Sequence, residues 1–430
     1  MIFIHTADWH LGNQMHEIDR HEESQNFLRW LKNLIVEKNA ETLVVAGDIF
    51  DTANPSVDAR RLYYTFLASL VDTCCKNVII VGGNHDSAVM LDSAKELLEV
   101  LDIRVVGSIN NLLPSQMCFE LKDSCENVCG ICMAVPFVRE VELRNLLSDS
   151  EKCPDEELYL KVYQKLYTLV FEEAEKLRNG RAIPVIATGH LYANDLEGRL
   201  SDKKANEKCD DGMKVLDVLG TLGNVPSSVF PSVDYVALGH IHYSSVVAKN
   251  PAIRYSGSPF VMGFDEANRP HHVLCVEIEK TGEKSNLNVE KIETPETNLY
   301  RRISGTLAEI KTELEDLSGK SKSDKNADKN KSVFIELCYK RELGVSAQEF
   351  LAEAIKSLPE NVNVVSWKIA DSEKILSSSF DKFEASEIKN LDDKEIFTQL
   401  ILSKSGLSAE SEEGKAALEK FLPLFLQMCD

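Results

Sequence analysis

Long apolar runs are missing from this sequence of 430 residues. No stretch reaches the roughly 18 consecutive apolar residues that a membrane-spanning helix needs, so we expect no association with a membrane. The chain begins with a strand-like run that carries His5, Asp8 and His10, which is not the pattern of a signal peptide. The 11 cysteines are an odd number, and the neighbours Cys74 and Cys75 are poorly placed to bridge. A reducing, cytoplasmic setting is therefore the simpler expectation.

Basic residues are also scarce. Lysine and arginine number 48 against 69 acidic residues, and the formal net charge is -21. Because contacts to phosphate backbones depend on Lys and Arg and on the release of counterions, we expect this chain alone to bind nucleic acid poorly. The length allows more than one domain, and the hydrophobic content of 43% suits an ordinary soluble core.

One stretch, residues 77–86, has unusual chemistry: Asn-Val-Ile-Ile-Val-Gly-Gly-Asn-His-Asp. Its apolar, β-branched run followed by glycines predicts a buried strand that ends in a tight turn. The turn presents an amide oxygen, an imidazole and a carboxylate on Asn84, His85 and Asp86, groups that bind metals and carry protons. The same order of an apolar run and then ligand residue types recurs before Asp8 and His10, before Asp48, before His190, and before His240 and His242.

In this order, the motifs Asp-x-His, Gly-Asp, Gly-Asn-His-Asp, Gly-His and Gly-His-x-His resemble the signature of the calcineurin-like metallophosphoesterases. Within them, Asp-Trp-His-Leu-Gly at 8–12, Gly-Asp-Ile-Phe-Asp at 47–51, Ala-Leu-Gly-His-Ile-His at 237–242 and Tyr-Ser-Gly-Ser-Pro at 255–259 are similar to the SbcD family, the nuclease subunits of bacterial SbcCD complexes. The resemblance covers roughly residues 1–270.

The resemblance implies a site for two divalent ions that hydrolyses phosphodiesters, because two closely spaced metals neutralise the substrate and supply a hydroxide. Two ions that close need a shared carboxylate. The ligands carried over from the family are Asp8, His10 and His242 for one ion, Asn84, His190 and His240 for the other, and Asp48 as the bridge. Mixed oxygen and nitrogen ligands suit manganese or a similar first-row ion better than calcium.

His85 is adjacent to a ligand and outside the set, so we expect it to be the proton donor or to orient the phosphate. Asp51, three residues after the bridging aspartate, is expected to hold the His85 imidazole in place. Asn13 stands where relatives often carry a basic residue, which puts one phosphate contact in doubt. The remaining histidines are expected to be ordinary hydrogen bonders: His5, His16, His21, His271 and His272.

The pattern predicts an α/β fold, a calcineurin-like β-sandwich flanked by helices. Amphipathic periodicity predicts helices at 22–38, 57–71, 87–101 and 155–177. Residues 103–138 are expected to supply strands of the second sheet. In the resembled family the second and third of these helices lie in the region that pairs two nuclease subunits; the alternative is that they only cover the sheet. The long connection 191–234 is expected at the substrate-facing rim.

Four cysteines fall close together, at Cys118, Cys125, Cys129 and Cys132, so a structural zinc site is one interpretation. The favoured one is that residues 128–137 form a buried strand, in which cysteine acts as a small apolar side chain.

Domain boundaries are expected near residues 296 and 375. Residues 1–296 form the metallophosphoesterase domain, and residues 297–375 form a small α+β capping domain whose helix opens with a Thr306/Glu309 capping box. The Lys/Ser/Asp/Asn tract 320–331 is of low complexity and is expected to be a mobile loop. Residues 376–430 are expected to be a tether and a helical pair that docks on the coiled coil of an ATPase; the alternative is that this pair folds back on the small domain.

By resemblance, the function is a metal-dependent DNA exonuclease and endonuclease that acts with an SbcC-like SMC-family ATPase in DNA repair, recombination and replication. A homodimer within a heterotetramer is expected, and the partner would supply the positive surface that this chain lacks. Two alternatives remain: a small-molecule phosphodiesterase or phosphomonoesterase with the same two metals, and a scaffold without activity.

Overall fold

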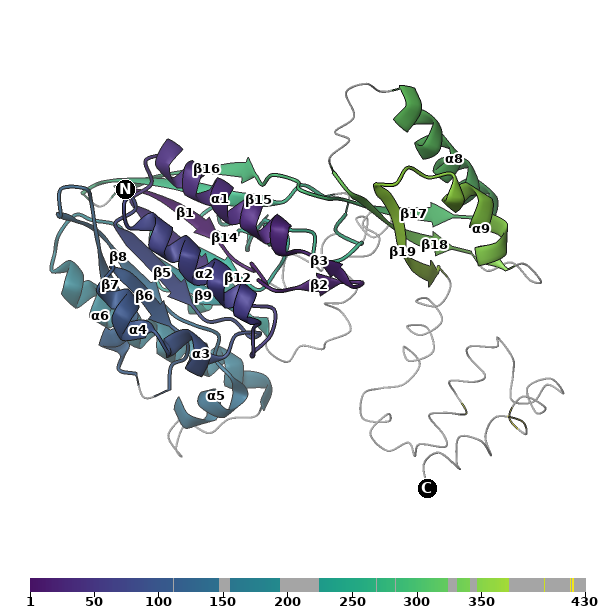
Figure 1. Cartoon of the computed structure of the whole chain (residues 1–430). Helices are drawn as coiled ribbons and strands as arrows, with labels where there is room; N and C mark the ends of the chain where they lie inside the picture. Colours follow the sequence, from purple (N-terminus) through teal and green to yellow (C-terminus); the bar gives the residue numbers. More distant parts are fainter. Residues whose placement is uncertain are drawn as a thin grey trace. The chain divides into compact units, whose positions relative to one another are not determined.

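The computed structural model describes residues 1–110, 112–146, 155–193, 224–267, 269–282, 284–323, 331–340 and 346–370, with residues 398, 418 and 420. It divides into two compact units, Met1–Leu299 and Tyr300–Asp430 (Figure 1). Within the described parts, no helix is long and apolar enough to cross a membrane. Most of the connection 191–234 and the expected tether and helical pair at 376–430 lie outside the described residues.

The first unit contains two six-stranded sheets. One has the order β16-β15-β1-β4-β5-β6, in which β1, β4, β5 and β6 run parallel and β15 and β16 form an antiparallel edge. Its strands are β1 (Ile2–Thr6), β4 (Thr42–Ala46), β5 (Asn77–Val81), β6 (Ile103–Val106), β15 (His272–Thr281) and β16 (Lys284–Glu293).

The other sheet has the order β13-β14-β12-β9-β8-β7, with β8, β9, β12 and β14 parallel. Its strands are β7 (Cys118–Lys122), β8 (Val128–Ala134), β9 (Val185–His190), β12 (Tyr235–Gly239), β13 (Ser245–Val246) and β14 (Ile253–Tyr255). The strand at 128–134 agrees with the favoured interpretation of the cysteine-rich stretch.

Helices cover the outer face of each sheet (Figure 1). Residues of α1 and α2 share a core with the first sheet, and residues of α6 belong to the cluster that contains the second sheet. The prediction of an α/β sandwich flanked by helices is confirmed. The helices of this unit are α1 (His21–Glu37), α2 (Val57–Leu70), α3 (Ala88–Asp92), α4 (Lys95–Glu99), α5 (Glu140–Leu146) and α6 (Asp155–Arg178).

Burial on both faces explains the continuous apolar runs of the central strands. Along β4, Val44 enters the core between the sheets, whereas Leu43 and Val45 enter the core beneath α1 and α2. Successive side chains of a strand point to opposite faces, so a strand covered on both sides needs an apolar residue at every position. These strands therefore display nothing reactive along their length, and chemistry is confined to their ends.

His5 joins the two sheets in their buried interior. Its Nε2 lies 3.2 Å from the Leu238 carbonyl and its Nδ1 lies 3.0 Å from the Tyr235 hydroxyl. Because a carbonyl only accepts, Nε2 carries the proton of the neutral ring and Nδ1 accepts from the tyrosine. His5 is thus a satisfied hydrogen bonder, as expected from the sequence.

Two expectations for this unit are wrong in part. β6, inside the range assigned to the second sheet, pairs with β5 of the first. The single helix expected at 87–101 is divided into α3 and α4. At the division, the Ser93 hydroxyl donates to the Met90 carbonyl (2.6 Å), and the Asp92 carboxylate accepts from the Gly107 amide (3.0 Å). These side-chain bonds compete with continuation of the helix.

The second unit has a three-stranded sheet, with the order β17-β18-β19, and two helices that share its core. Its elements are β17 (Leu299–Gly305), α8 (Leu307–Ser323), β18 (Val333–Tyr339), α9 (Ala347–Lys356) and β19 (Val362–Ile369). The Thr306 hydroxyl and the Glu309 carboxylate form the predicted capping box. The expectation of a loop from residue 320 is wrong at its start, since α8 continues to Ser323.

Acidification should lower the free energy of unfolding through His5, whose hydrogen bonds join the two sheets. Burial lowers the pKa of His5 to about 3, against an unfolded value near 6.5. The unfolded chain therefore binds more protons between these values, so the stabilisation is complete above pH 6.5 and is lost as the pH falls toward 3. The difference in the free energy of unfolding is up to about 5 kcal/mol.

Urea unfolding between pH 7 and pH 4 measures this loss. His5→Gln should have a flatter dependence of the unfolding midpoint on pH than the wild type. His16→Gln, which changes an exposed histidine, should follow the wild type. Parallel curves for the wild type and His5→Gln would rule out this role for His5.

Candidate metal centre

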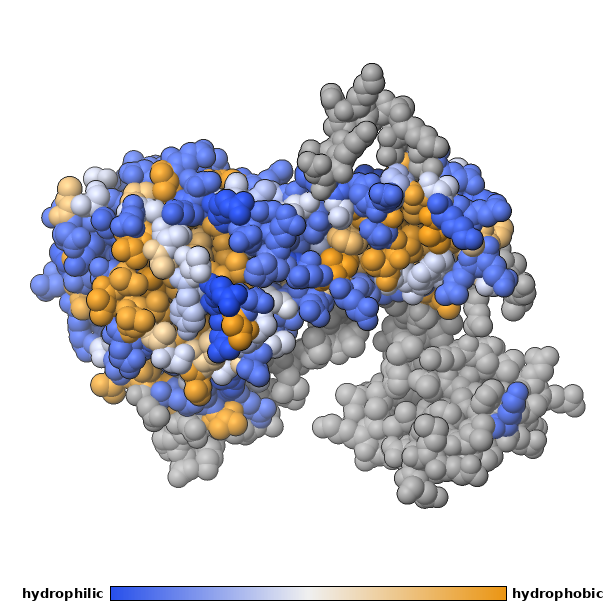
Figure 2. All heavy atoms as spheres, in the orientation of Figure 1, coloured by the Kyte–Doolittle hydropathy of each residue, from blue (hydrophilic) through white to orange (hydrophobic). Residues whose placement is uncertain are grey.

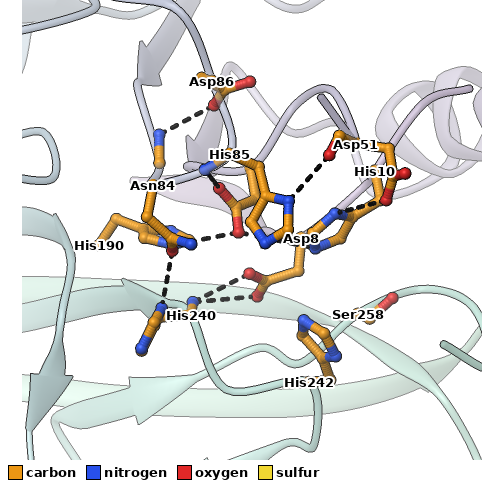
Figure 3. A network of polar contacts seen from close by, with 12 residues as sticks. Asp8, His10, Asp51, Asn84, His85, Asp86, His190, His240, His242 and Ser258 are labelled. Carbon is orange, nitrogen blue, oxygen red and sulfur yellow. Dashed lines mark hydrogen bonds and ion pairs between the residues drawn. The ribbon is translucent and has the colours of Figure 1, made fainter. Parts of the chain in front are cut away.

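Five strand ends meet at one edge of the sandwich. The strands β1, β4 and β5 come from the first sheet, and β9 and β12 come from the second. Parallel strands bring their carboxyl ends to a common edge, which is where ligands bind in such sheets. Figure 3 shows the polar side chains that follow these strands turned toward a common space between the two sheets.

The backbone is strained at four of the expected ligands. Asp8, His10, Asp48 and His240 have φ angles of 54, 43, 50 and 100°. A residue other than glycine in this region costs on the order of 1–3 kcal/mol and persists only where the surrounding structure imposes it. These conformations redirect the side chains at the strand ends into the shared space.

Main-chain hydrogen bonds between the first two ligand loops impose this conformation. The Asp8 amide donates to the Gly47 carbonyl (3.0 Å), and the His10 amide donates to the Asp48 carbonyl (3.0 Å). The first sheet is linked to the second in the same region, because the His240 amide donates to the Asp8 carboxylate (2.9 Å).

One group of side chains contains Asp8, His10 and His242, whose ligand atoms lie within 4.8 Å of one another. His10 is 3% exposed, and neither of its ring nitrogens has a hydrogen bond among the described residues. A buried polar atom without a partner is costly, and a bound cation would satisfy it. His242 faces the Glu266 carboxylate through Nδ1, at 3.5 Å.

A second group centres on Asp48. Its Oδ1 accepts from the His85 amide (2.9 Å), and its Oδ2 lies 3.6 Å from His10 Nε2 and 3.3 Å from His190 Nε2. The Asn84 amide oxygen lies 3.0 Å from His190 Nε2 and 2.9 Å from His240 Nδ1. Asp48 thus stands between the two sets of nitrogens.

Burial and neighbouring charges shift the pKa values of the side chains in this cluster strongly. Burial raises the pKa of Asp48, but the His190 charge and its hydrogen bond outweigh burial and leave this pKa well below its ordinary value. Burial lowers the pKa of His190, but the Asp48 carboxylate raises it to about 9. Burial lowers the pKa of His240 to about 3, so this imidazole is neutral. An ionised carboxylate and a neutral imidazole are the forms that bind metals, so His190 would release its proton when a metal binds.

Two glycines let the ligand loops approach this closely. At Gly47, with φ of +90°, an added Cβ would lie 2.2 Å from His190 Nδ1. At Gly83, an added Cβ would lie 2.1 Å from the Asp48 carboxylate. Any side chain at either position would displace an expected ligand.

The structure brings all seven expected ligands into this cluster, but it places Asp51 differently from the expectation. The Asp51 main-chain carbonyl, rather than its carboxylate, lies 2.8 Å from His85 Nδ1. The carboxylate instead lies 3.3 Å from His10 Nδ1 and accepts from the Asn13 amide at 2.9 Å. The His85 ring lies at the exposed rim, where it meets the Asp51 main-chain carbonyl. The Asp51 carboxylate turns instead toward the buried His10.

Sequence reasoning missed two positioning carboxylates. Asp86 is buried, and it accepts from the amides of Gly83 (2.8 Å), Ile49 (3.1 Å) and Phe50 (2.9 Å). It thereby ties the turn that carries Asn84 and His85 to the loop after β4, and its place in the Gly-Asn-His-Asp motif was a signal for it. Glu266 lies outside every motif, and no sequence pattern marks it.

The donor set fits divalent first-row metals. Carboxylate oxygens, an amide oxygen and imidazole nitrogens converge, which matches ions such as manganese. Asp8 belongs to the group with His10 and His242 and also to a group with Asp48 and His190. Two overlapping groups of ligands give the arrangement of a two-metal centre.

Comparisons with known proteins agree with this geometry. The model of the calcineurin-like phosphoesterase family matches residues 1–244. The chain is similar to SbcD of the SbcCD nuclease from Escherichia coli strain K12, at 31% identity over 73% of this chain and 74% of the relative. It is also similar to the SbcD proteins of Rhodobacter capsulatus (28%, covering 65% of this chain and 66% of the relative) and Bacillus subtilis (29%, covering 66% and 68%).

Proposed function

This chain belongs to the calcineurin-like phosphoesterases and, within them, to the SbcD family, and from that premise we propose that it cleaves DNA phosphodiesters with two bound divalent ions. The observation that carries the proposal is the convergence of ligand side chains from five strand ends on one space. A protein scaffold without chemistry would have no need for the strained backbone at this edge, or for buried His10 nitrogens that lack a hydrogen bond among the described residues.

One ion would be held by Asp8, His10 and His242, the other by Asn84, His190 and His240, and Asp48 would bridge them. Manganese is the ion we propose. When bound, the two ions supply charge neutralisation and a hydroxide at neutral pH. The chain contributes the rigid spacing of the ligands, since main-chain bonds fix Asp8 and His10 against the loop after β4.

His85 would carry a proton at the rim of this site. Its Nδ1 donates to the Asp51 carbonyl, which fixes the ring and its tautomer and leaves Nε2 to act on substrate. The hydrogen bond from the His85 backbone amide to the Asp48 carboxylate keeps His85 beside the proposed metal site. The His85 side chain is exposed, so a polymer can reach it. In its doubly protonated form, the ring would donate from Nε2 to orient a phosphate oxygen or to protonate the leaving oxygen.

The relatives are named as D subunits of SbcCD nucleases. From the family resemblance we propose that DNA ends and hairpins are the substrates and that an SbcC-like SMC-family ATPase is the partner. The roles in DNA repair, recombination and replication follow from the same relationship. An acidic chain with a charge of -21 needs positive surface from elsewhere to hold DNA. The partner ATPase is the proposed source.

A pair of variants separates metal binding from proton transfer. Asp48→Asn should lose metal and activity together, because a neutral amide does not offset two divalent charges. His85→Asn should keep both ions and lose roughly 10²- to 10⁴-fold in cleavage of DNA. Metal analysis and turnover of labelled linear and hairpin DNA, with nucleotide phosphates as the competing substrates, provide the measurements.

Full metal occupancy in Asp48→Asn would remove Asp48 as the bridge. Wild-type cleavage by His85→Asn would remove His85 from the mechanism. Faster turnover of nucleotide phosphates than of DNA would overturn the substrate class.

An exposed apolar surface on α2, α3 and α4 fits the pairing of two copies of this chain. A hollow of about 520 Å³ lies between these helices and is lined on its apolar side by Tyr64, Met90, Leu97 and Leu101. Leu97 is 69% exposed and Val100 is 79% exposed. Figure 2 shows hydrophobic side chains gathered on this face over α2 and α4. A contiguous exposed apolar surface of this kind marks an interaction site.

Leu97→Glu should shift a dimer toward monomer, weakening association at least tenfold, because an unpaired carboxylate is costly to bury. Sedimentation over a range of protein concentrations measures this shift. Val246→Glu is the matched control, since Val246 is 42% exposed on β13, the edge strand of the second sheet. A monomeric wild type, or a dimer insensitive to Leu97→Glu, would contradict this assignment.

We propose a three-part organisation, with residues 1–296 as the nuclease domain, residues 297–375 as the capping domain and residues 376–430 as the docking element for the ATPase. The last assignment rests on sequence alone. Its apolar residues exceed what one helix seam uses, including Phe397, Ile401, Phe421 and Phe425.

Deletion of residues 385–430 tests the docking element. The shortened protein should stay soluble and hydrolyse a small phosphodiester at the wild-type rate, because the site lies in the first unit. It should fail to co-purify with the ATPase. An undiminished complex would contradict docking, and an insoluble product would favour the alternative that this segment completes the small domain.

A further inference from the structure

We infer that Arg20 positions one of the two proposed metal sites, the one formed by Asp8, His10 and His242. The inference rests on the proposed two-metal function. Arg20 lies outside every motif, immediately before α1, and it is 3% exposed. A buried guanidinium in the chain's metal-binding unit is expected to have a role in its organisation, because burying a charge is costly unless it is paired and hydrogen-bonded.

One hydrogen bond of Arg20 Nη1 begins a chain of contacts that reaches His10. Arg20 Nη1 donates to the Asn13 amide oxygen (3.2 Å), and Asn13 Nδ2 donates to Asp51 Oδ1 (2.9 Å). A guanidinium only donates and a carboxylate only accepts, so the orientation of the Asn13 amide is fixed. The same Asp51 oxygen lies 3.3 Å from His10 Nδ1. A carboxylate at Nδ1 leaves Nε2, on the side of Asp48, as the metal-binding nitrogen.

A second hydrogen bond of the same nitrogen begins a chain of contacts that reaches His242. Arg20 Nη1 also donates to the Val261 carbonyl, at 2.7 Å. The amide of the next residue, Met262, donates to Glu266 Oε2 (2.8 Å), and Glu266 Oε1 lies 3.5 Å from His242 Nδ1. One nitrogen of Arg20 therefore contacts both segments that orient the histidines of this site.

Arg20 is itself held in place from two further directions. Its Nε donates to the Glu23 carboxylate at 2.7 Å, and its guanidinium carbon lies 5.4 Å from the centre of the Phe260 ring. A lysine would keep the charge, but it could not reproduce this fork and its stacking on an aromatic ring. Arg20→Lys is therefore a mild change that should still disturb the positioning.

The other proposed site is supported independently of Arg20. His190 is oriented by its Nδ1, which donates to the Ala46 carbonyl at 2.8 Å. His240 is oriented by the amide oxygen of Asn84 at 2.9 Å. Neither contact passes through Asn13 or residues 261–266, so a change at Arg20 should act on one ion and spare the other. Loss of a group that orients metal ligands typically weakens metal affinity by about 10- to 100-fold.

Calorimetric titration of the full-length, metal-free protein with Mn²⁺ tests this inference. The wild type should bind two ions. Arg20→Lys and Asn13→Ala should each bind one ion with wild-type affinity and the other at least tenfold more weakly. Lys280→Met should match the wild type, because it breaks a similarly buried ion pair with Asp234 that lies at the opposite ends of the strands.

Unchanged affinity for both ions in Asn13→Ala and Arg20→Lys, or equal weakening of both ions, would overturn the role of Arg20. If Arg20→Lys does not fold, Asn13→Ala decides, since it removes only the link to Asp51. A wild type that binds fewer than two ions would instead overturn the two-metal function itself. Addition of excess Mn²⁺ should restore DNA cleavage in both variants, whereas a general loss of structure would not respond to metal.

Discussion

The hydrogen bond from His190 Nδ1 to the Ala46 carbonyl is the contact on which the arrangement of the site depends. It joins the end of β9 in one sheet to the end of β4 in the other, and it turns His190 Nε2 toward Asp48 at 3.3 Å. The approach is possible because residue 47 is glycine. Once these two strand ends are fixed together, the loops that carry the remaining ligands have little freedom to separate.

Stability and chemistry are divided between different parts of each strand. The apolar runs are buried on both faces and supply the favourable free energy of folding, while the residues beyond the strand ends adopt strained, left-handed conformations. Main-chain bonds between loops and the three amides held by Asp86 offset this strain. The first unit can therefore hold a buried imidazole such as that of His10, whose nitrogens have no hydrogen bond among the described residues, without losing its fold.

Much of this arrangement was predictable from the sequence, because an apolar run followed by ligand residue types reports both a strand and its chemical end. The sheet to which a short strand belongs was not predictable, as β6 illustrates, since a strand of only four residues carries no information on its pairing. The function of Asp51 was also beyond sequence reasoning, because its carbonyl and its carboxylate face different histidines. Glu266 and Arg20 act through contacts between distant loops, and nothing in their local sequence distinguishes them from other charged residues.

The central claim is that this edge of the sandwich holds two metal ions on either side of Asp48. The most direct test is a crystal of the full chain soaked in Mn²⁺, with anomalous difference maps collected at the manganese edge. The account predicts two peaks, one beside Asp8, His10 and His242 and one beside Asn84, His190 and His240, with Asp48 in contact with both. A single peak, or peaks that do not contact Asp48, would contradict it.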